Sequence, residues 1–274
     1  MSKYSWINYI HQRIKNNKNF VCILTGPPGN GKSWTALSIA EQLDPEFTLD
    51  RVCFRAKDIM KQINGGNMKS GSVLIWDEAG IDLSNRNWQS ELNKVVNFLL
   101  QTFRHRNFIL IFTTPYSDFV DAATRKLFDA EFETVKILKD ERKVRLKAKC
   151  LQYNSRQKKF YAKYLRVIKP GVGFIKIKKW DVPAPSVKLR NGYEKLKLEF
   201  TSSLNREIMD RIHNVDFDGK RKKPLTLLQK QIEECWKLGI KKQKDIGARL
   251  GKTQQQISMN ENWMYSKGYF KENY

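Results

Sequence analysis

The chain has 274 residues and a formal net charge of +23, so it is long enough for one large domain and a small one. No apolar run approaches the ~18 residues of a membrane span, and the N-terminus lacks the apolar stretch of a secretory signal. The four cysteines form no metal-ligand spacing, and we expect reduced thiols in a soluble cytoplasmic protein that has no membrane partner.

The first informative segment is a glycine-rich loop between an apolar run at 20–25 and a helix-like stretch at 32–43. Residues 26–33 fit the phosphate-binding pattern G-x-x-x-x-G-K-[ST] at every fixed position. A chance Gly/Pro turn would not need these flanks. We predict that the loop binds ATP, with Lys32 on the β- and γ-phosphates and Ser33 on Mg²⁺. The residues expected to contact the nucleotide are Gly26, Pro27, Pro28, Gly29, Asn30, Gly31, Lys32, Ser33 and Trp34.

A later strand ends in two carboxylates. The apolar run 72–76 leads directly to Asp77 and Glu78. After a phosphate-binding loop, Asp77 fits the residue that holds Mg²⁺ with Ser33, and Glu78 fits the base that activates water. Kinases and small GTPases usually lack the second carboxylate, so the pair favours the P-loop ATPases that use a catalytic glutamate. The alternative is a solvated acidic turn.

The next strand adds candidates that stay open. The apolar run 108–112 ends in Thr113 and Thr114, where a polar side chain commonly senses the γ-phosphate in such ATPases. Thr114 is the expected sensor and Thr113 the alternative, although a Thr-Pro strand terminator explains the pattern nearly as well. Arg104 and Arg106 precede this strand. One of them is predicted to reach a neighbouring subunit's γ-phosphate as an arginine finger, unless both form surface ion pairs.

The first half alternates strands and helices, which is typical of an α/β fold with a parallel sheet flanked by helices. Such a P-loop NTPase core would cover residues 1–140. Gly26, Asp77 and Thr114 should then meet at the carboxyl ends of the strands, where these sheets bind ligands. The predicted strands are 20–25, 51–54, 72–77, 107–113 and 129–138, and the predicted helices are 32–43, 56–63, 88–102 and 118–127.

The positive charge belongs to the second half. Residues 1–135 hold 16 Lys and Arg against 14 Asp and Glu, whereas residues 136–274 hold 35 against 14. A lysine-rich genome would raise the count in both halves. The imbalance therefore favours a polyanionic partner, most simply DNA or RNA, over a role in solubility or an acidic protein partner.

Alternating residues at 142–150 and 160–167 surround a turn at 154–158, which predicts a basic β-hairpin. Residues 174–180 are a further candidate strand. The hairpin either follows a phosphate backbone or is a solvated sheet edge that lysines protect.

Apolar residues recur every three or four positions over 189–212 and predict a long helix, which with the hairpin would complete or extend the core over 141–213. A polar linker follows at 214–224. Helices at 225–238, 244–250 and 254–265 predict a helix-turn-helix, winged-helix-like domain at 225–274, with Ala248 where two helices cross closely. Double-stranded DNA is its expected partner, and a protein-binding helical bundle is the alternative. The expected DNA contacts are Lys252, Gln254, Gln255, Gln256, Ser258 and Asn260.

Three segments resemble a known family: residues 26–33, the run 74–80 with Arg86 after it, and the run 104–106. The first ~135 residues resemble P-loop ATPases of the HerA/FtsK group, especially zonula occludens toxin-like proteins and ATPases of archaeal viruses and plasmids. The resemblance implies ATP hydrolysis and assembly into homo-oligomers, such as hexameric rings, that move DNA or assemble virions. The toxin-like proteins often carry Gln where Thr114 stands, and they carry a membrane anchor that is not found here.

We therefore expect an ATP-hydrolysing, DNA-binding protein of a virus or plasmid that acts as an oligomeric translocase or DNA-packaging motor. The competing hypothesis is an ATP-switched DNA-binding regulator, a partition protein, or a helper ATPase for replication or transposition. A third is an RNA-binding or virion structural protein with a vestigial site, which the intact Lys32, Asp77 and Glu78 disfavour. Continuous hydrolysis on DNA would distinguish a motor from a switch.

Overall fold

The computed structural model of the chain describes residues 5–66, 68–78, 106–120, 125–213, 225–266 and 269. The chain divides into two compact units, Met1–Leu198 and Glu199–Tyr274. Within the described residues, no helix combines the length and the apolar character that crossing a membrane requires.

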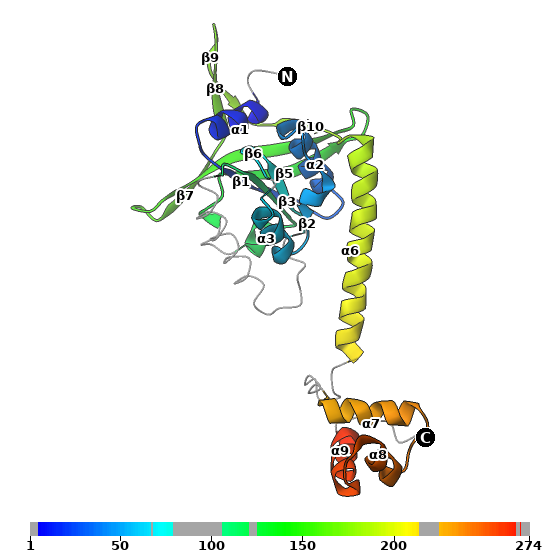
Figure 1. The fold of residues 1–274 in the computed structure, drawn as a ribbon. Coiled ribbons are helices and arrows are strands. Elements are labelled where there is room, and N and C mark those ends of the chain that lie inside the picture. The colour runs from blue at the N-terminus through cyan, green and yellow to red at the C-terminus, as the bar shows by residue number, and fades with distance from the viewer. Residues whose placement is uncertain are drawn as a thin grey trace. The chain divides into compact units, whose positions relative to one another are not determined.

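A mostly parallel sheet forms the centre of the first unit (Figure 1). Its strands are β1 (Phe20–Thr25), β2 (Val52–Cys53), β3 (Val73–Trp76), β4 (Ile109–Thr114), β5 (Ala130–Leu138), β6 (Lys143–Asn154), β7 (Lys159–Lys163) and β10 (Trp180–Pro183). They follow the order β10-β6-β5-β1-β4-β3-β2, with β7 paired to β6. Strands β1 to β5 run parallel, whereas β6, β7 and β10 join by antiparallel pairing. The predicted α/β class is confirmed.

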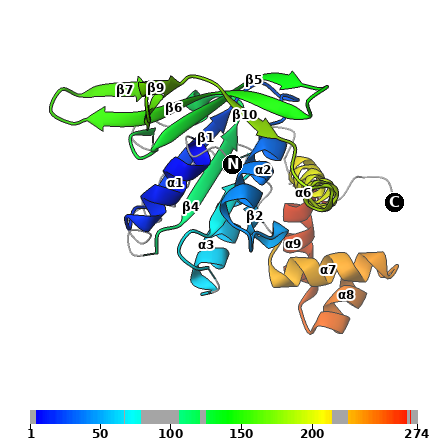
Figure 2. The same ribbon diagram turned by 90° about the horizontal axis from the view of Figure 1, so that it is seen from above.

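Helices cover both faces of this sheet, because alternate residues of the buried strands point to opposite sides. Helices α1 (Trp6–Lys15) and α2 (Lys32–Leu43) pack against each other and against β1 (Figure 2). Helix α3 (Ala56–Asn64) packs on the other face, where Ile59 and Ile63 join a core with Val21. The predicted helix 88–102 lies outside the described residues, and the described part of 118–127 begins with a short 3₁₀ turn, Ser117–Phe119.

Helix α1 was not predicted from the sequence. The Ser5 hydroxyl accepts a hydrogen bond from the backbone N–H of Asn8 and caps the helix. Trp6 is fully buried and its ring contacts the rings of Phe132 and Trp180. Tertiary contacts with residues far along the chain therefore stabilise this short helix, and a local pattern does not reveal them.

The segment predicted as one strand at 160–167 is divided between two hairpins. Strand β7 pairs with β6, whereas β8 (Leu165–Lys169) pairs with β9 (Gly173–Ile177) in a separate two-stranded sheet. The turn at Pro170 and Gly171 supplies residues 165–169 with a partner close in sequence, so the chain leaves the edge of β6 after Lys163.

A long helix, α6 (Val187–His213), runs from the first unit into the second. The second unit contains α7 (Leu227–Lys237), α8 (Gln243–Leu250) and α9 (Gln254–Ser266). Their core is formed by Ile232, Cys235, Ile246, Ile257 and Met264.

The residue at the close contact between α8 and the turn before α9 is Gly247. A Cβ atom there would lie 2.7 Å from the carbonyl oxygen of Lys252, so a side chain would collide with the backbone. Ala248, which was expected to have this role, is exposed. The expectation identified the right turn but the wrong residue, because neighbouring helical positions face different sides.

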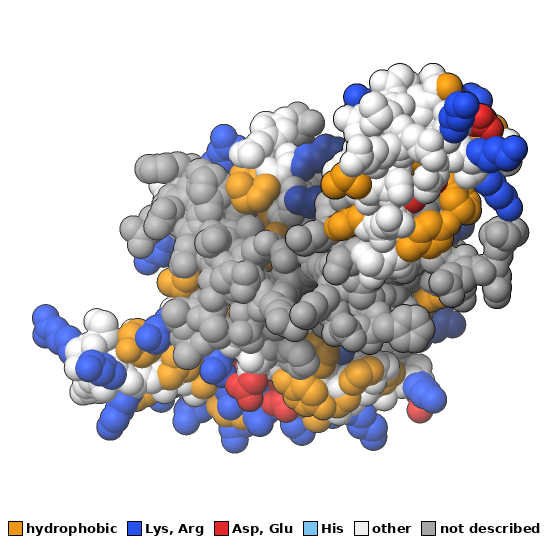
Figure 3. Space-filling view, turned by 90° about the horizontal axis from the view of Figure 1, so that it is seen from below, with side chains coloured by type: hydrophobic (Ala, Val, Ile, Leu, Met, Phe, Trp, Pro, Cys, Tyr) orange, Lys and Arg blue, Asp and Glu red, His pale blue; other side chains and the backbone are white. Residues whose placement is uncertain are grey.

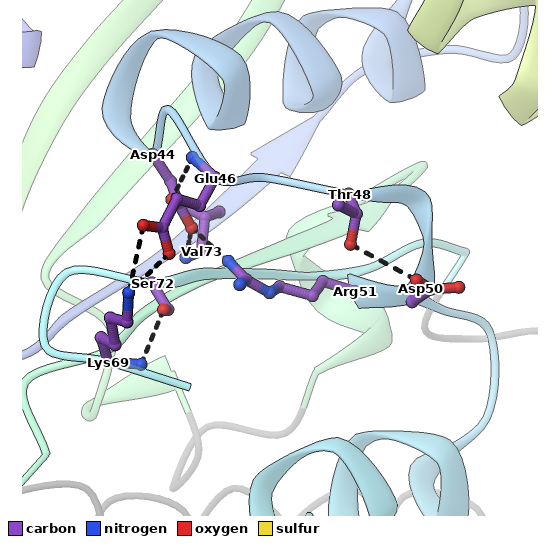
Figure 4. A network of polar contacts seen from close by, with 8 residues as sticks. All are labelled: Asp44, Glu46, Thr48, Asp50, Arg51, Lys69, Ser72 and Val73. Atoms are coloured by element: carbon purple, nitrogen blue, oxygen red, sulfur yellow. Dashed lines mark hydrogen bonds and ion pairs between the residues drawn. The ribbon is translucent and has the colours of Figure 1, made fainter. Parts of the chain in front are cut away.

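A buried carboxylate fixes the end of α2 against the start of β3 (Figure 4). Asp44 accepts hydrogen bonds from the backbone N–H groups of Glu46 and Val73, both at 3.0 Å, and from the Arg51 guanidinium at 2.5 Å. The side chains of Asp44 and Arg51 are 8 % and 13 % exposed. Helix α2 begins within residues 26–33, and β3 directly precedes Asp77. This network therefore fixes the elements that carry these two functional segments relative to each other.

We expect Asp44→Ala to lower the free energy of unfolding by about 3–5 kcal/mol, because it leaves the Arg51 charge and a buried N–H group without a partner. Urea denaturation would measure the loss. Glu46→Ala is the matched control: its ion pair with Lys69 is 65–75 % exposed, and its loss should cost less than about 1 kcal/mol. Equal losses for the two variants would contradict this interpretation.

Candidate nucleotide-binding site

The glycine-rich loop connects the end of β1 to the start of α2. Gly26 has φ 144°, and a Cβ atom there would lie 1.9 Å from Oγ1 of Thr134 on β5. Gly29 and Gly31 also have positive φ, at 80° and 76°, and Gly31 is the N-cap of α2. These conformations favour glycine, and they turn the loop around the N-terminus of a helix, which attracts anions.

Lys32 lies against the loop itself. Its ammonium donates to the carbonyl oxygens of Gly26 at 2.7 Å and Pro27 at 3.0 Å. Burial lowers the pKa of Lys32, Asp77 and Glu78 oppose this shift, and Lys197 adds to it. The two hydrogen bonds hold the Lys32 ammonium at the loop that was predicted to bind phosphate.

Asp77 is the centre of the polar contacts. This carboxylate is fully buried at the end of β3. Its Oδ1 accepts hydrogen bonds from the hydroxyls of Ser33 at 3.0 Å and Thr113 at 2.5 Å, and its Oδ2 accepts one from the hydroxyl of Tyr193. The carboxyl ends of β1, β3 and β4 meet here because these strands are parallel neighbours. The structure therefore brings Ser33 and Asp77 together, as the predicted Mg²⁺ site requires.

Glu78 follows in a left-handed backbone conformation, with φ 51°. Its N–H donates to Oγ1 of Thr113 at 2.8 Å, and its carboxylate accepts from the ammonium of Lys197 at 2.7 Å. Both side chains of this ion pair are about 30 % exposed, at 29 % and 31 %. Thr113 therefore contacts both acidic residues, whereas the hydroxyl of Thr114 donates to the carbonyl of Tyr116 at 3.2 Å.

Helix α6 supplies contacts that the sequence did not reveal. Tyr193 and Lys197 bind Asp77 and Glu78, and Glu194 accepts a hydrogen bond from the indole of Trp34 at 2.8 Å. Burial and the neighbouring Asp77 carboxylate raise the pKa of Tyr193, so its hydroxyl stays a donor. Tyr193 lies 116 positions after Asp77, and Lys197 lies 119 positions after Glu78. Partners so far apart leave no local signal in the sequence.

A cavity of about 750 Å³ joins these groups, within the size range of small-molecule sites. The site fits a nucleotide with Mg²⁺, because it combines an open glycine-rich side, the Lys32 ammonium and the Ser33–Asp77 pair. Lys32 would contact the phosphates, and Ser33 and Asp77 would hold the ion. Its lining consists of Pro28, Gly29, Gly31, Lys32, Ser33, Trp34, Glu78, Thr113, Thr114, Pro115, Ile137, Val144, Tyr193, Glu194 and Lys197. Gly26, Pro27 and Asn30 lie in the loop but do not line the cavity.

Of the two candidate arginines, Arg106 alone belongs to the part of the chain that the structure describes, and it does not line this cavity. Arg104 lies outside the described residues, and Arg106 is exposed and donates to the carbonyl of Ile63 at the end of α3, at 3.0 Å. A finger that acts on a neighbouring subunit need not line its own cavity, so the arginine-finger hypothesis stays a prediction.

The predicted DNA contacts of the second unit divide into two groups. Lys252, Gln254 and Gln255 are exposed, and Ser258 is half-buried. Gln256 instead caps α9, accepting from the N–H of Thr253 at 3.1 Å. Asn260 accepts from the side-chain amide of Gln229 at 3.2 Å and donates to the carbonyl of Gln256 at 2.8 Å. Their side chains are thus engaged within the unit.

Residues 22–135 match the AAA family, the ATPase family associated with various cellular activities. No curated protein sequence matches the chain. Similar solved structures include the N-terminal domain of zonular occludens toxin from Neisseria meningitidis, with 17% identity, a TM-score of 0.33, and coverage of 54% of this chain and 94% of that one.

The FIGL-1 AAA domain in complex with ADP is 21% identical, with a TM-score of 0.32 and coverage of 42% and 43%. Thermotoga maritima RuvB is 15% identical, with a TM-score of 0.34 and coverage of 96% and 85%. Scores this low support no inference about substrate or partner. The AAA match is broader than the HerA/FtsK assignment. Residues 22–135 form an AAA-type P-loop ATPase domain, and the chain is an ATP-hydrolysing enzyme.

Proposed function

We propose that this enzyme is an oligomeric, DNA-binding ATPase of a virus or plasmid, related to the HerA/FtsK group, that moves or packages double-stranded DNA. The observation that supports the proposal most directly is that Lys32, Ser33 and Glu78 line one cavity, with the buried Asp77 hydrogen-bonded to Ser33 behind it. The excess positive charge of the chain lies outside this ATPase half. The mobile-element role rests on the sequence resemblance alone.

The residues at the cavity have distinct roles in this proposal. Lys32 binds the β- and γ-phosphates, and Ser33 and Asp77 would hold Mg²⁺, which would supply positive charge beside the terminal phosphate. Glu78 accepts a proton from the attacking water. Thr113 replaces Thr114 as our candidate sensor, because its hydroxyl contacts Asp77 and the Glu78 backbone together.

The second unit has the residue types that read DNA. Helix α9 begins with exposed Gln254 and Gln255, and Lys252 precedes it. Amide side chains bind adenine edges in a major groove, and lysines bind phosphates. We infer a helix-turn-helix contact with duplex DNA through these residues, with Gln256 and Asn260 stabilising the helix.

Contacts from α6 favour a second candidate, an ATP-dependent switch. Tyr193 and Lys197 occupy the two carboxylates that hydrolysis requires. The Lys197 ammonium occupies a carboxylate oxygen of Glu78 that would accept the proton of the attacking water, so α6 restrains turnover until the ion pair separates. A regulator or partition protein would use this restraint to hydrolyse slowly, whereas a motor would release it on DNA.

We expect duplex DNA to stimulate steady-state ATP hydrolysis, and Glu78→Gln to abolish hydrolysis while ATP still binds. The amide cannot accept the proton, and losing such a base costs about 10²–10⁴-fold in rate.

Lys32→Ala should abolish nucleotide binding or hydrolysis and is the control for the site. Slow turnover that is indifferent to DNA would favour the switch, and unchanged turnover in Lys32→Ala would remove the assignment of the loop.

Lys197→Ala should raise the turnover measured without DNA by up to about fivefold, because a partly exposed ion pair is worth up to about 1 kcal/mol. Lys195→Ala is the control, since this lysine is exposed on the same helix and forms no ion pair among the described residues. A fall in turnover would instead mean that Lys197 serves the ATP-bound state.

In the full-length chain, Lys252→Ala should weaken duplex binding and lower the slope of log affinity against log salt by about 1, as expected for one lost phosphate contact. Fluorescence anisotropy at several salt concentrations would measure both quantities. Lys188→Ala, an exposed lysine on α6, is the control. The same slope for all three proteins would place the duplex site elsewhere.

A further inference from the structure

The hairpin formed by β8 and β9, residues 165–177, extends from the central sheet as a two-stranded ribbon of its own (Figure 1). We call these residues the finger. Leu165, 6 % exposed, anchors its base. At its tip the N–H of Val172 donates to the carbonyl of Lys169 at 3.0 Å, across Pro170 and Gly171, which has φ 76°. Proline and a glycine at positive φ fix such a turn, so the shape of the tip is preset.

Three large apolar side chains are exposed at this tip. Ile168, Val172 and Phe174 are 63 %, 64 % and 76 % exposed, and Ile168 pairs with Phe174 across the two strands. An isolated two-stranded ribbon is marginally stable in water, and an exposed apolar cluster marks a contact surface. We therefore expect the tip of the finger to bind a partner.

The charge around the finger identifies the chemistry of that partner. Residues 142–180 contain 14 Lys and Arg and no Asp or Glu. Ion pairs described for this stretch involve Lys143, Arg145 and Lys147, all on β6. Figure 3 shows Lys and Arg side chains beside hydrophobic ones along the neighbouring arm of β6 and β7. This excess of positive charge favours a polyanionic partner.

The arrangement favours nucleic acid over an anionic membrane. Lys169 lies at the tip between Ile168 and the turn, so burial of Val172 in lipid would carry a charged group into the hydrocarbon, at considerable cost. In contrast, Phe174 and Lys176 lie two positions apart on β9 and share one face, with Arg166 opposite Lys176. An aromatic ring beside two cations matches a base and its phosphates.

We infer that the finger binds single-stranded DNA, with an unpaired base stacked on Phe174 and the adjoining phosphates bound by Arg166 and Lys176. Ile168 shields the stacked base from water. The inference rests on the proposed function, in that the chain acts on DNA. It adds a contact that does not depend on base sequence. The contact favours single strands, since the bases of a duplex stack on one another and leave no free face for the ring.

The test uses the full-length protein and a labelled oligothymidylate of about 20 nucleotides, longer than a typical single site. Phe174→Ala should weaken binding by about 5- to 100-fold and leave the salt slope unchanged, because stacking releases no counterions. Lys176→Ala should lower the slope by about 0.7, the value for one phosphate of a single strand. Phe174→Trp should keep the wild-type affinity.

Val187→Ala is the matched control, because Val187 is also exposed, at 61 %, but lies outside the finger. Wild-type affinity for the oligonucleotide in Phe174→Ala overturns the inference, as does a loss confined to binding of phosphatidylserine vesicles. Binding to a duplex of the same length distinguishes a failure of the proposed function from a failure of the inference about the finger. Binding to neither form of DNA contradicts the proposed function, whereas intact duplex binding with no effect of Phe174→Ala removes the finger alone.

Discussion

The buried carboxylate of Asp77 is the constraint on which the site depends. An ionised group without solvent is costly unless its oxygens accept hydrogen bonds, so three hydroxyls must be held around it. Ser33 comes from α2, Thr113 from β4 and Tyr193 from α6. The need of one side chain thus fixes the relative positions of a strand, its neighbour and two helices. The Asp44 network does the same at the opposite end of α2.

The parts of the fold and site that the sequence predicted are those with local causes. The loop at 26–33 and its flanking strand and helix are contiguous, and buried parallel strands are recognisable as short apolar runs. Thr113 and Thr114 could not be separated, because both end the same strand and only contacts across the sheet show which hydroxyl faces Asp77. Tyr193 and Lys197 act through a helix more than a hundred residues away from the acidic pair.

The second unit shows a different limit. Gln256 and Asn260 have side chains suited to base edges, yet the structure uses them to cap α9 and to join it to α7. Residue type describes what a side chain can bind, whereas burial and local geometry decide what it does bind. The same reasoning separates Gly247 from Ala248, since adjacent residues of one helix meet different surroundings.

Helix α6 has a mechanical consequence. Its early turns contact the ATPase site at Trp34, Asp77 and Glu78, and the helix continues as one element to His213. At a rise of about 1.5 Å per residue, the part beyond Lys197 is about 24 Å long. Because residues of this one helix bind Trp34, Asp77 and Glu78, the phosphate-binding loop and both carboxylates are coupled through a single element.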